Sequence, residues 1–313
     1  MIYEQLKEKK LKEKVIAQTS KEDFEAFWQE QVNMLRSIPV SYTREKLELP
    51  YDKSFESYEI VFNTHDETKV HAYFSVPLNR GEEKLPCVAY FRGGGGKKEI
   101  WPDILATRVC CFTMDIRSQG GTTADKAVYS VEASYHGLMT KGVTNKETFY
   151  MKNIYLDAVR AMDVIASLPE VDPERIVTFG QSQGGALSIV ASALSGHSKK
   201  CFTCEPSYNC IWNRIEAGSG VFGAIKKFLR SRPELTDAVF DTVTYFDVNN
   251  MAPMLKIPTD VSIGLDDQTC LPEFVYSVYT HIAGEKELKM YPFEQHVIPQ
   301  GYRMFFLNEL SKL

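Results

Sequence analysis

The sequence predicts a single α/β domain, residues 1–313, built on a doubly wound and mostly parallel sheet. Short apolar segments bounded by glycine or charge alternate with longer segments of helical periodicity, which is typical of repeated βαβ units. A Gly-x-Ser-x-Gly pattern at residues 180–184 lies between one strand-like segment and one helical segment. The length of 313 residues, 44% of them hydrophobic, suits one large core with insertions better than two independent domains.

The first fifty residues predict a polar helical extension. Residues 1–14 alternate Lys and Glu with Leu and Ile, which indicates a solvated amphipathic helix. Phe24, Phe27 and Trp28 offer an apolar face for packing against the domain. Residues 1–14 lack the apolar core of a secretion signal, so we expect a cytoplasmic protein.

The predicted core elements follow in strand–helix order. Two alternating apolar runs flank residues 63–66 and predict a β-hairpin over residues 59–76. Further strands are predicted from short apolar runs at residues 86–91, 109–114, 175–179, 259–264 and 288–291, and helices from segments at residues 150–168, 186–191, 272–283 and 299–310.

Two segments interrupt this order. Residues 121–146 are rich in Gly, Thr and Ser, and an irregular stretch of that length inside a domain is usually functional or an interface. Residues 205–253 combine helical and polar segments and predict a cap-like insertion. Between the strands, Asp115-x-Arg117 with Gly120-Gly121 predicts a structural ion pair and a turn below the site.

The segment Gly180-Gln181-Ser182-Gln183-Gly184-Gly185 carries the strongest functional signal. Strand, Gly-x-Ser-x-Gly and helix together are the setting of a nucleophile elbow. The turn is so tight that small residues must flank the serine, and it presents the hydroxyl and the next backbone N–H to the same spot. An ordinary serine in a glycine-rich turn is the alternative, and the flanking elements favour the elbow.

A serine nucleophile needs a base, normally a histidine held in one tautomer by a carboxylate. After such an elbow the acid and then the histidine follow later strands. His296 lies in a loop after the last predicted strand, so we expect it to be the base. The other histidines lie before the elbow or in and beside helices: His65, His71, His136, His197 and His281. Asp266 and Asp267 both follow the strand ending at Gly264, and either suits the acid or a simple turn.

The developing oxyanion needs two preorganised N–H donors. The backbone of Gln183 supplies one, and the other is expected at Gly93 in Arg92-Gly93-Gly94-Gly95-Gly96, where glycine lets the backbone approach a ligand. We expect the substrate to contact Arg92, Gly94, Gln181 and His136. A phosphate-binding loop would need a Gly-Lys-Ser/Thr ending, whereas this run continues Lys97-Lys98-Glu99.

Composition excludes several partners. The formal net charge is -5 without a basic stripe, which argues against nucleic acid, and no apolar stretch approaches transmembrane length. We expect the seven cysteines to be reduced thiols with a structural role. Cys201-x-x-Cys204 lacks a matching second pair, so we expect no metal site.

These motifs together resemble carbohydrate esterase family seven, the acetyl xylan esterases and cephalosporin-C deacetylases of the α/β-hydrolase fold. The resemblance runs from about residue 50 to the end and rests on residues 115–121, 137–142, 180–185 and 264–267. It implies that Ser182 is the nucleophile and His296 the base. It also implies that Asp267 is the acid, because the family pattern is Gly-Leu-x-Asp.

The resemblance further implies a function and an assembly. The expected reaction is removal of O-acetyl groups from small acetylated carbohydrates such as xylo-oligosaccharides, and from acetyl esters such as cephalosporin C, through an acyl-enzyme and without metal or organic cofactor. The expected assembly is a homohexamer built through the loop near residues 121–142. The family usually has tyrosine at the position of Gly93, so glycine there suggests a wider pocket for larger or anionic acyl groups, with Arg92, Lys97 and Lys98 nearby.

Two other interpretations remain at this point. One is a different acyl hydrolase of the same fold, such as an aminopeptidase-like or lactone hydrolase. The other is a catalytically silent binding protein on this scaffold. An intact Ser, Asp and His in the right order argues against the silent protein.

Overall fold

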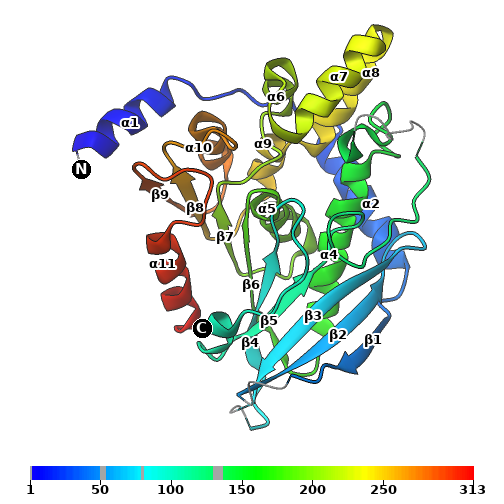
Figure 1. The fold of residues 1–313 in the computed structure, drawn as a ribbon, viewed down its shortest axis with the longest axis vertical. Coiled ribbons are helices and arrows are strands. Elements are labelled where there is room, and N and C mark those ends of the chain that lie inside the picture. Colours follow the sequence, from blue (N-terminus) through cyan, green and yellow to red (C-terminus); the bar gives the residue numbers. More distant parts are fainter. Residues whose placement is uncertain (1, 50–53, 79–80, 130–136) are drawn as a thin grey trace.

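The computed structural model describes residues 2–49, 54–78, 81–129 and 137–313. Through them runs a nine-stranded sheet in the order β1-β2-β3-β5-β4-β6-β7-β8-β9 (Figure 1). The pairings from β1 to β5 along that order are antiparallel, and the pairings from β5 to β9 are parallel. The strands are β1 (Tyr42–Lys46), β2 (Phe55–Asn63), β3 (Lys69–Pro77), β4 (Leu85–Phe91), β5 (Cys110–Met114), β6 (Val171–Gln181), β7 (Lys200–Cys204), β8 (Thr259–Gly264) and β9 (Lys286–Tyr291).

Helices cover both faces of this sheet. A larger hydrophobic cluster contains side chains of α2, α4, α5, α9 and α10, and a smaller cluster on the other face contains those of α3 and α11. Along β4, Ala89 and Phe91 join the larger cluster while Val88 and Tyr90 join the smaller one, as the period of two in a strand requires. The helices are α1 (Ile2–Lys12), α2 (Phe24–Ser37), α3 (Pro102–Leu105), α4 (Tyr150–Ser167), α5 (Gln183–Ser195), α6 (Ile211–Ala217), α7 (Gly223–Ser231), α8 (Thr236–Val243), α9 (Val248–Met251), α10 (Pro272–His281) and α11 (Gln300–Leu310).

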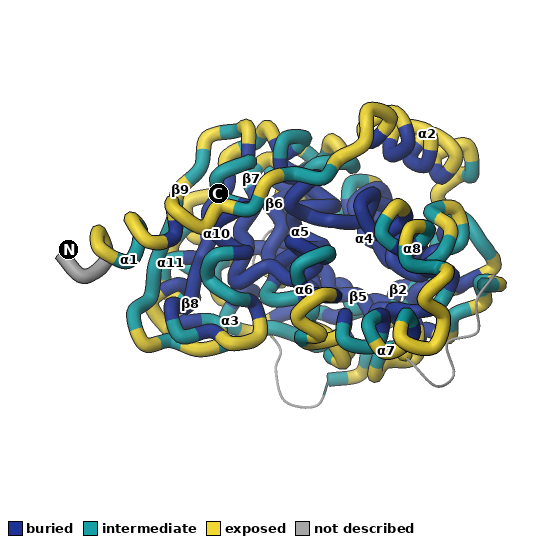
Figure 2. Tube along the Cα trace, turned by 90° about the horizontal axis from the view of Figure 1, so that it is seen from above, coloured by how far each residue is buried: buried dark blue, intermediate teal, exposed yellow. Residues whose placement is uncertain are grey.

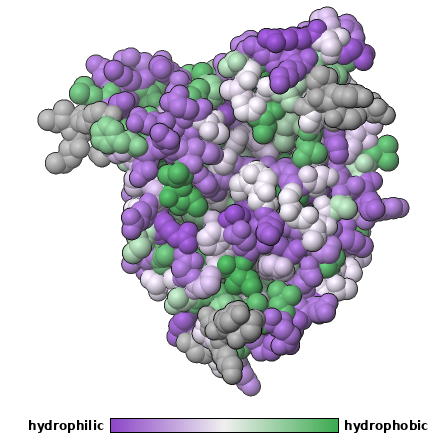
Figure 3. All heavy atoms as spheres, in the orientation of Figure 1, coloured by the Kyte–Doolittle hydropathy of each residue, from purple (hydrophilic) through white to green (hydrophobic). Residues whose placement is uncertain are grey.

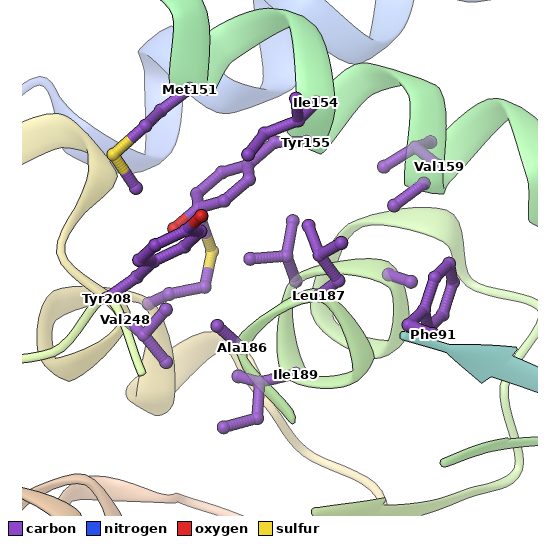
Figure 4. Close-up of a cluster of buried hydrophobic side chains, with 14 of the residues drawn as sticks. Phe91, Met151, Ile154, Tyr155, Val159, Ala186, Leu187, Ile189, Tyr208 and Val248 are labelled. Atoms are coloured by element: carbon purple, nitrogen blue, oxygen red, sulfur yellow. The ribbon is translucent and has the colours of Figure 1, made fainter. Parts of the chain in front are cut away.

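The helices α4 and α5 are buried along most of their length, as their dark blue colour in Figure 2 shows. Figure 4 shows where they meet, with Tyr155 and Val159 of α4 facing Leu187 of α5 in the larger cluster. Because α5 begins at the residue after Ser182, this packing fixes the direction in which the Gly-x-Ser-x-Gly turn projects from the sheet.

The predicted fold class and the order of the predicted elements are confirmed. The sequence does not predict two strands, β1 and β7. The strand β1 lies at the sheet edge inside the expected helical extension, and its polar sequence YTREK lacks the apolar run of a buried strand. The strand β7 is only five residues long and lies between β6 and β8, so its backbone bonds on both sides come from distant parts of the chain.

Both cysteines of the Cys-x-x-Cys pair lie on β7, and their side chains cannot form a shared metal site. Cys201 belongs to the larger cluster and Cys204 to the smaller one, so the two thiols lie on opposite faces of the sheet and cannot bind the same ion. Burial raises the pKa of Cys201 to about 12, which keeps that thiol protonated. All seven cysteines of the chain are buried and reduced.

The predicted ion pair between Asp115 and Arg117 is wrong, because each side chain binds other partners. Asp115 accepts the ammonium of Lys98 at 3.0 Å, whereas the buried Arg117 binds Asp157 at 2.6 Å, Asp66 at 2.7 Å and Asp125 at 3.1 Å. These carboxylates come from α4, from the β2–β3 turn and from the loop after β5. Arg117 therefore joins three segments far apart in the sequence.

The insertion over residues 205–253 contains α6, α7, α8 and α9, and α7 and α8 project beyond the sheet at the upper right of Figure 1. Its function as a cap stays a prediction. On the face drawn in Figure 3, hydrophilic side chains dominate and the hydrophobic ones form separate patches outside the grey atoms. Among the helices of the described ranges, none has the length and apolarity needed to cross a bilayer.

Candidate active site

Ser182 lies on a strained turn between β6 and α5. Its backbone has φ 58° and ψ -122°, an uncommon region for a residue other than glycine and one that clusters at functional sites. Its N–H donates to the Cys204 carbonyl at 3.0 Å, and its own carbonyl accepts the Ser207 N–H at 2.9 Å. Two backbone hydrogen bonds, one to the last residue of β7 and one to the segment after it, thus hold the strained residue in place.

The flanking glycines are required by space. A Cβ added at Gly180 would lie 2.2 Å from the Gly184 carbonyl oxygen, and one added at Gly184 would lie 2.0 Å from that of Phe91. Both neighbours are backbone atoms of central elements, so neither can move aside cheaply. The local sequence therefore folds as an elbow because no side chain fits on either side of the serine.

This crowding gives a testable prediction for Gly184→Ala. We expect a melting temperature lower by the equivalent of ~1–3 kcal/mol, the usual cost of overpacking, together with loss of ester turnover as the elbow shifts. Gly196→Ala is the matched control, because Gly196 ends the same helix and an added Cβ there meets no heavy atom within 4 Å, although its φ of 72° adds some strain. Scanning calorimetry and turnover of both variants check this, and a Gly184→Ala protein as active as Gly196→Ala would contradict it.

His296 and Asp267 form a direct pair. Asp267 Oδ2 lies 2.7 Å from His296 Nδ1, and the Asp267 carboxylate is fully buried. The other oxygen, Oδ1, accepts the backbone N–H groups of Thr269 at 2.6 Å and Cys270 at 2.9 Å. Of the two adjacent aspartates, the structure brings Asp267 to the histidine, while the backbone N–H of Asp266 donates to the Glu294 carbonyl.

A second buried carboxylate, that of Glu205, lies against the same histidine. Its Oε2 lies 3.3 Å from His296 Nδ1 and accepts the side-chain amide of Gln181 at 3.3 Å. Glu205 directly follows β7, so Gln181, Ser182 and His296 are gathered around the end of that strand. The described residues contain no hydrogen bond from Ser182 to His296, and such bonds often form only when substrate is bound.

These carboxylates change the protonation of the histidine. Burial by itself lowers the pKa of His296, but the hydrogen bonds to Asp267 and Glu205 outweigh it and raise the pKa to about 9. Burial raises the pKa of Glu205 to about 7, against the opposing effect of His296. The site therefore favours the imidazolium, the form that a general base reaches in the transition state.

The sequence does not predict that Glu205 belongs to the site. A signal was available, because a carboxylate at the end of a parallel strand beside the elbow strand is well placed for a site. That inference depends on the strand over residues 200–204, which the sequence does not predict.

The glycine loop after β4 approaches the elbow as expected. A Cβ placed on Gly93 would lie 4.0 Å from Ser182 Cβ and 3.7 Å from the Gln181 carbonyl. Gln183 is buried, and its side-chain Oε1 accepts the hydroxyl of Tyr208 at 2.5 Å, which fixes the start of α5. The backbones of Gly93 and Gln183 therefore flank the serine, where the two oxyanion donors are expected.

The residues expected to contact substrate lie in different surroundings. Gly94 lines the cavity beside the elbow, and the side chain of Gln181 is bound to Glu205. The Arg92 guanidinium lies 3.4 Å from the Glu99 carboxylate and 5.2 Å from the centre of the Trp101 ring. His136 lies outside the described residues, so its contact with substrate stays a prediction.

A cavity of about 850 Å³ opens beside Gln183, the residue that follows the serine. Gly94, Gly95 and Gln183 form its edge at the elbow, and Gln119 and Met139 line it further out. The opposite wall comes from α7 and the residues before it. Its volume falls within the range of ligand-binding clefts, which combine an apolar lining with a few polar groups.

The remaining described histidines are bound elsewhere: His65 to Asn153, His71 to Glu59, His197 to Asp163 and His281 to Asn249. Asp267, Cys270 and His296 bring ligand-type atoms within 4.8 Å of one another. Burial raises the pKa of Cys270 to about 11, so its thiol stays protonated, and the aspartate and histidine already bind each other. This group fits a metal ion poorly.

A doubly wound α/β domain with a serine elbow, a glycine loop beside it and a histidine–aspartate pair is an α/β-hydrolase-type domain. Within that class, the chain belongs to the acetyl xylan esterase family, because the model described as "Acetyl xylan esterase (AXE1)" matches residues 1–310.

Individual proteins agree with this family. The acetyl esterase Axe7A of Xylanibacter ruminicola is 27% identical over 282 residues, which are 88% of this chain but only 63% of that protein. The structure of an acetyl xylan esterase from Paenibacillus sp. R4 aligns with a TM-score of 0.91 and 29% identity, over 97% of this chain and 98% of that one. Acetyl xylan esterase 1 from Thermoanaerobacterium sp. JW/SL YS485 aligns with a TM-score of 0.87 and 25% identity, over the same shares.

Proposed function

We propose that the protein is a serine esterase that removes O-acetyl groups from small acetylated carbohydrates, such as xylo-oligosaccharides, and from related acetyl esters such as cephalosporin C. The observation that carries this proposal is the His296–Asp267 pair beside the strained Ser182, in a chain of the acetyl xylan esterase family. A silent binding protein would have no use for a strained serine together with a buried aspartate hydrogen-bonded to a histidine.

In the proposed mechanism, His296 takes the proton of Ser182 Oγ while that oxygen attacks the ester carbonyl carbon. The backbone N–H groups of Gln183 and Gly93 donate to the oxyanion, each worth ~3 kcal/mol by comparison with other hydrolases. The imidazolium, oriented by Asp267, then protonates the leaving sugar oxygen, and an acetyl-enzyme remains. Water, activated by His296, attacks the acetyl carbonyl and releases acetate from Ser182.

The cavity beside the elbow supports a small carbohydrate as the alcohol part of the ester. Its volume of about 850 Å³ suits an oligosaccharide of a few units. We therefore place the acetyl group at Gly93 and the sugar between Gly94 and α7.

Acetate release from acetylated xylo-oligosaccharides tests the proposal, with p-nitrophenyl acetate as the reference ester. Turnover of both substrates by the purified protein is the expected result. Turnover of p-nitrophenyl acetate alone would keep the esterase and remove the carbohydrate, and inertness toward both would overturn the proposal.

A second candidate function is hydrolysis of larger acyl esters, favoured by the space at Gly93. A Cβ added there meets nothing closer than 3.7 Å, so a side chain can begin at this position without a clash. Of the basic residues near the glycine loop, Arg92 pairs with Glu99 and Lys98 with Asp115, so the case for larger acyl groups rests on space and not on these two charges.

We expect Gly93→Tyr to narrow the acyl range. The ratio of kcat/KM for butyryl to acetyl p-nitrophenyl esters should fall about tenfold, because a pocket wall distinguishes single methylenes by ~1–3 kcal/mol. Gly93→Ala is the control and should change the ratio little, since its Cβ makes only ordinary contacts. An unchanged ratio in Gly93→Tyr would show that the acyl group does not lie against residue 93.

The assembly and the location belong to the same proposal. By resemblance to carbohydrate esterase family seven, we propose a cytoplasmic homohexamer formed through residues 121–142. Light scattering on the purified protein tests the assembly, with six times the chain mass of 35.6 kDa as the expected result.

A further inference from the structure

His296 Nδ1 has two carboxylates beside it where a Ser–His–Asp arrangement needs one. Asp267 Oδ2 is at 2.7 Å and Glu205 Oε2 at 3.3 Å, and both side chains are fully buried. Asp267 is anchored by two backbone N–H groups on its other oxygen. Glu205 has no comparable anchor, so the role of its charge has to be sought at the histidine.

The surroundings of Glu205 indicate a special placement. Its backbone has φ 46°, a strained conformation for a glutamate, and its N–H donates to the Ser262 carbonyl at 3.0 Å. Its Oε1 is buried, and no hydrogen-bond partner for it is found in the part of the chain that the structure describes. That oxygen occupies the space where a side chain on Gly264 would begin, 2.6 Å from an added Cβ.

A buried carboxylate with one unpartnered oxygen is costly unless it carries a proton or faces a cation. Among the described residues, the other titratable groups around the pair are Cys204, Cys270 and Arg214. Burial raises the pKa of both thiols, so they stay neutral. The Arg214 guanidinium binds the Thr269 carbonyl at 2.9 Å, on the side of Asp267. The imidazolium of His296 is therefore the cation that Glu205 faces.

The sign of the coupling follows from charge. An ionised Glu205 stabilises the imidazolium and so raises the pKa of His296, while a protonated Glu205 does so less. Burial raises the pKa of Glu205 to about 7, so its charge changes near neutral pH. The pKa values of His296 and Glu205 therefore depend on each other, because the charge of each residue changes the proton affinity of its neighbour.

We propose that Glu205 is a second positioning residue for His296, which shares the Nδ1 proton with Asp267 and, through its own charge, sets the pH below which the histidine stops acting as a base. The proposal rests on the proposed esterase function. It assigns to the segment after β7 a part in catalysis that the Ser–His–Asp arrangement alone does not contain.

Two measurements on Glu205→Gln test the proposal. The first is the acid limb of kcat/KM for p-nitrophenyl acetate, which should move to lower pH by about one unit, a tenfold gain over wild type on that limb. The second is NMR titration of the His296 ring in a Ser182→Ala background, with and without Glu205→Gln, which should show the same shift without any turnover. Gln fits the site because its amide oxygen can accept from Gln181 and Nδ1.

Controls separate charge from structure. Asp266→Asn removes a neighbouring negative charge that does not touch His296, and it should leave the limb in place. Glu205→Asp keeps the charge but moves it away from Nδ1, so it should shift the limb less and in the same direction. This variant replaces Glu205→Gln if the latter folds poorly. A limb and a titration that stay at the wild-type pH in both Glu205 variants would overturn the proposal. Absence of Ser182-dependent turnover would instead overturn the esterase function, and the NMR titration would remain interpretable.

Discussion

Ser182→Ala should lower kcat for p-nitrophenyl acetate by a factor on the order of 10⁵–10⁶, because removal of the nucleophile from a catalytic triad costs about that much. Any slow residual hydrolysis would come from the oxyanion donors and substrate binding. Alanine keeps the Cβ of serine, and the backbone bonds of residue 182 to Cys204 and Ser207 do not involve the side chain. The melting temperature should therefore stay close to that of the wild type.

Ser192→Ala is the matched control for this experiment. Ser192 lies on the same helix α5, is buried, and its hydroxyl bonds to Thr178 at 2.8 Å on the side away from the elbow. It should retain wild-type turnover. A fluorophosphonate probe should label the wild type and Ser192→Ala once per chain and leave Ser182→Ala unlabelled. Full turnover in Ser182→Ala would remove the serine from the mechanism.

The largest expected effect on stability is that of Arg117→Leu. The guanidinium is completely buried among Asp157, Asp66 and Asp125, and its removal leaves carboxylates without a cation. Breaking a buried ion pair on one side costs ~3–5 kcal/mol. Denaturant unfolding of the wild type and of Arg117→Leu measures this loss as the difference between their free energies of unfolding.

Arg232→Leu is the control for Arg117→Leu, because Arg232 pairs with Glu234 on the surface, where ion pairs contribute ~0–1 kcal/mol. The penalty of Arg117→Leu should also shrink at low pH. Burial raises the pKa of Asp66, but the hydrogen bond to Arg117 outweighs it and holds that pKa below its usual value. The stability from this pair is therefore present above the unfolded pKa and is lost as the pH falls through the folded one. An equal loss at acidic and neutral pH would contradict this origin.

The cluster around Arg117 also reaches the candidate site. The Arg117 carbonyl accepts the hydroxyl of Tyr150 at 2.6 Å, and that hydroxyl accepts the side-chain amide of Gln119 at 3.0 Å. Gln119 Oε1 in turn accepts the backbone N–H of Gly95 at 3.2 Å. The glycine loop beside Ser182 is thus supported by a chain of hydrogen bonds that ends at the buried ion cluster.

Local patterns were enough to predict the elements that carry a strong periodic signal. The helix α4 and the strand β8 follow from apolar spacing alone, and the elbow follows from the glycines that crowding requires. The approach of Asp267 to His296 follows from the rule that acid and base succeed later strands, although only the family pattern separated Asp267 from Asp266.

The unpredicted features depend on contacts between distant segments. The strand β7 is stable because β6 and β8 bind both of its edges, and its own five residues give little signal. Without β7, Glu205 had no position, and its burial against His296 could not be inferred. The partners of Arg117 were missed for the same reason, since Asp66 and Asp157 are 51 and 40 residues away.

The seven buried thiols have an experimental consequence. All seven are buried, and burial raises the pKa of Cys201 and Cys204, so a thiol reagent in solution meets no accessible sulfur on the native surface. A buried thiol can be modified only after the structure around that cysteine has opened. The rate of thiol labelling at Cys201 and Cys204, in the centre of the sheet, would therefore report how often the core of the native protein opens.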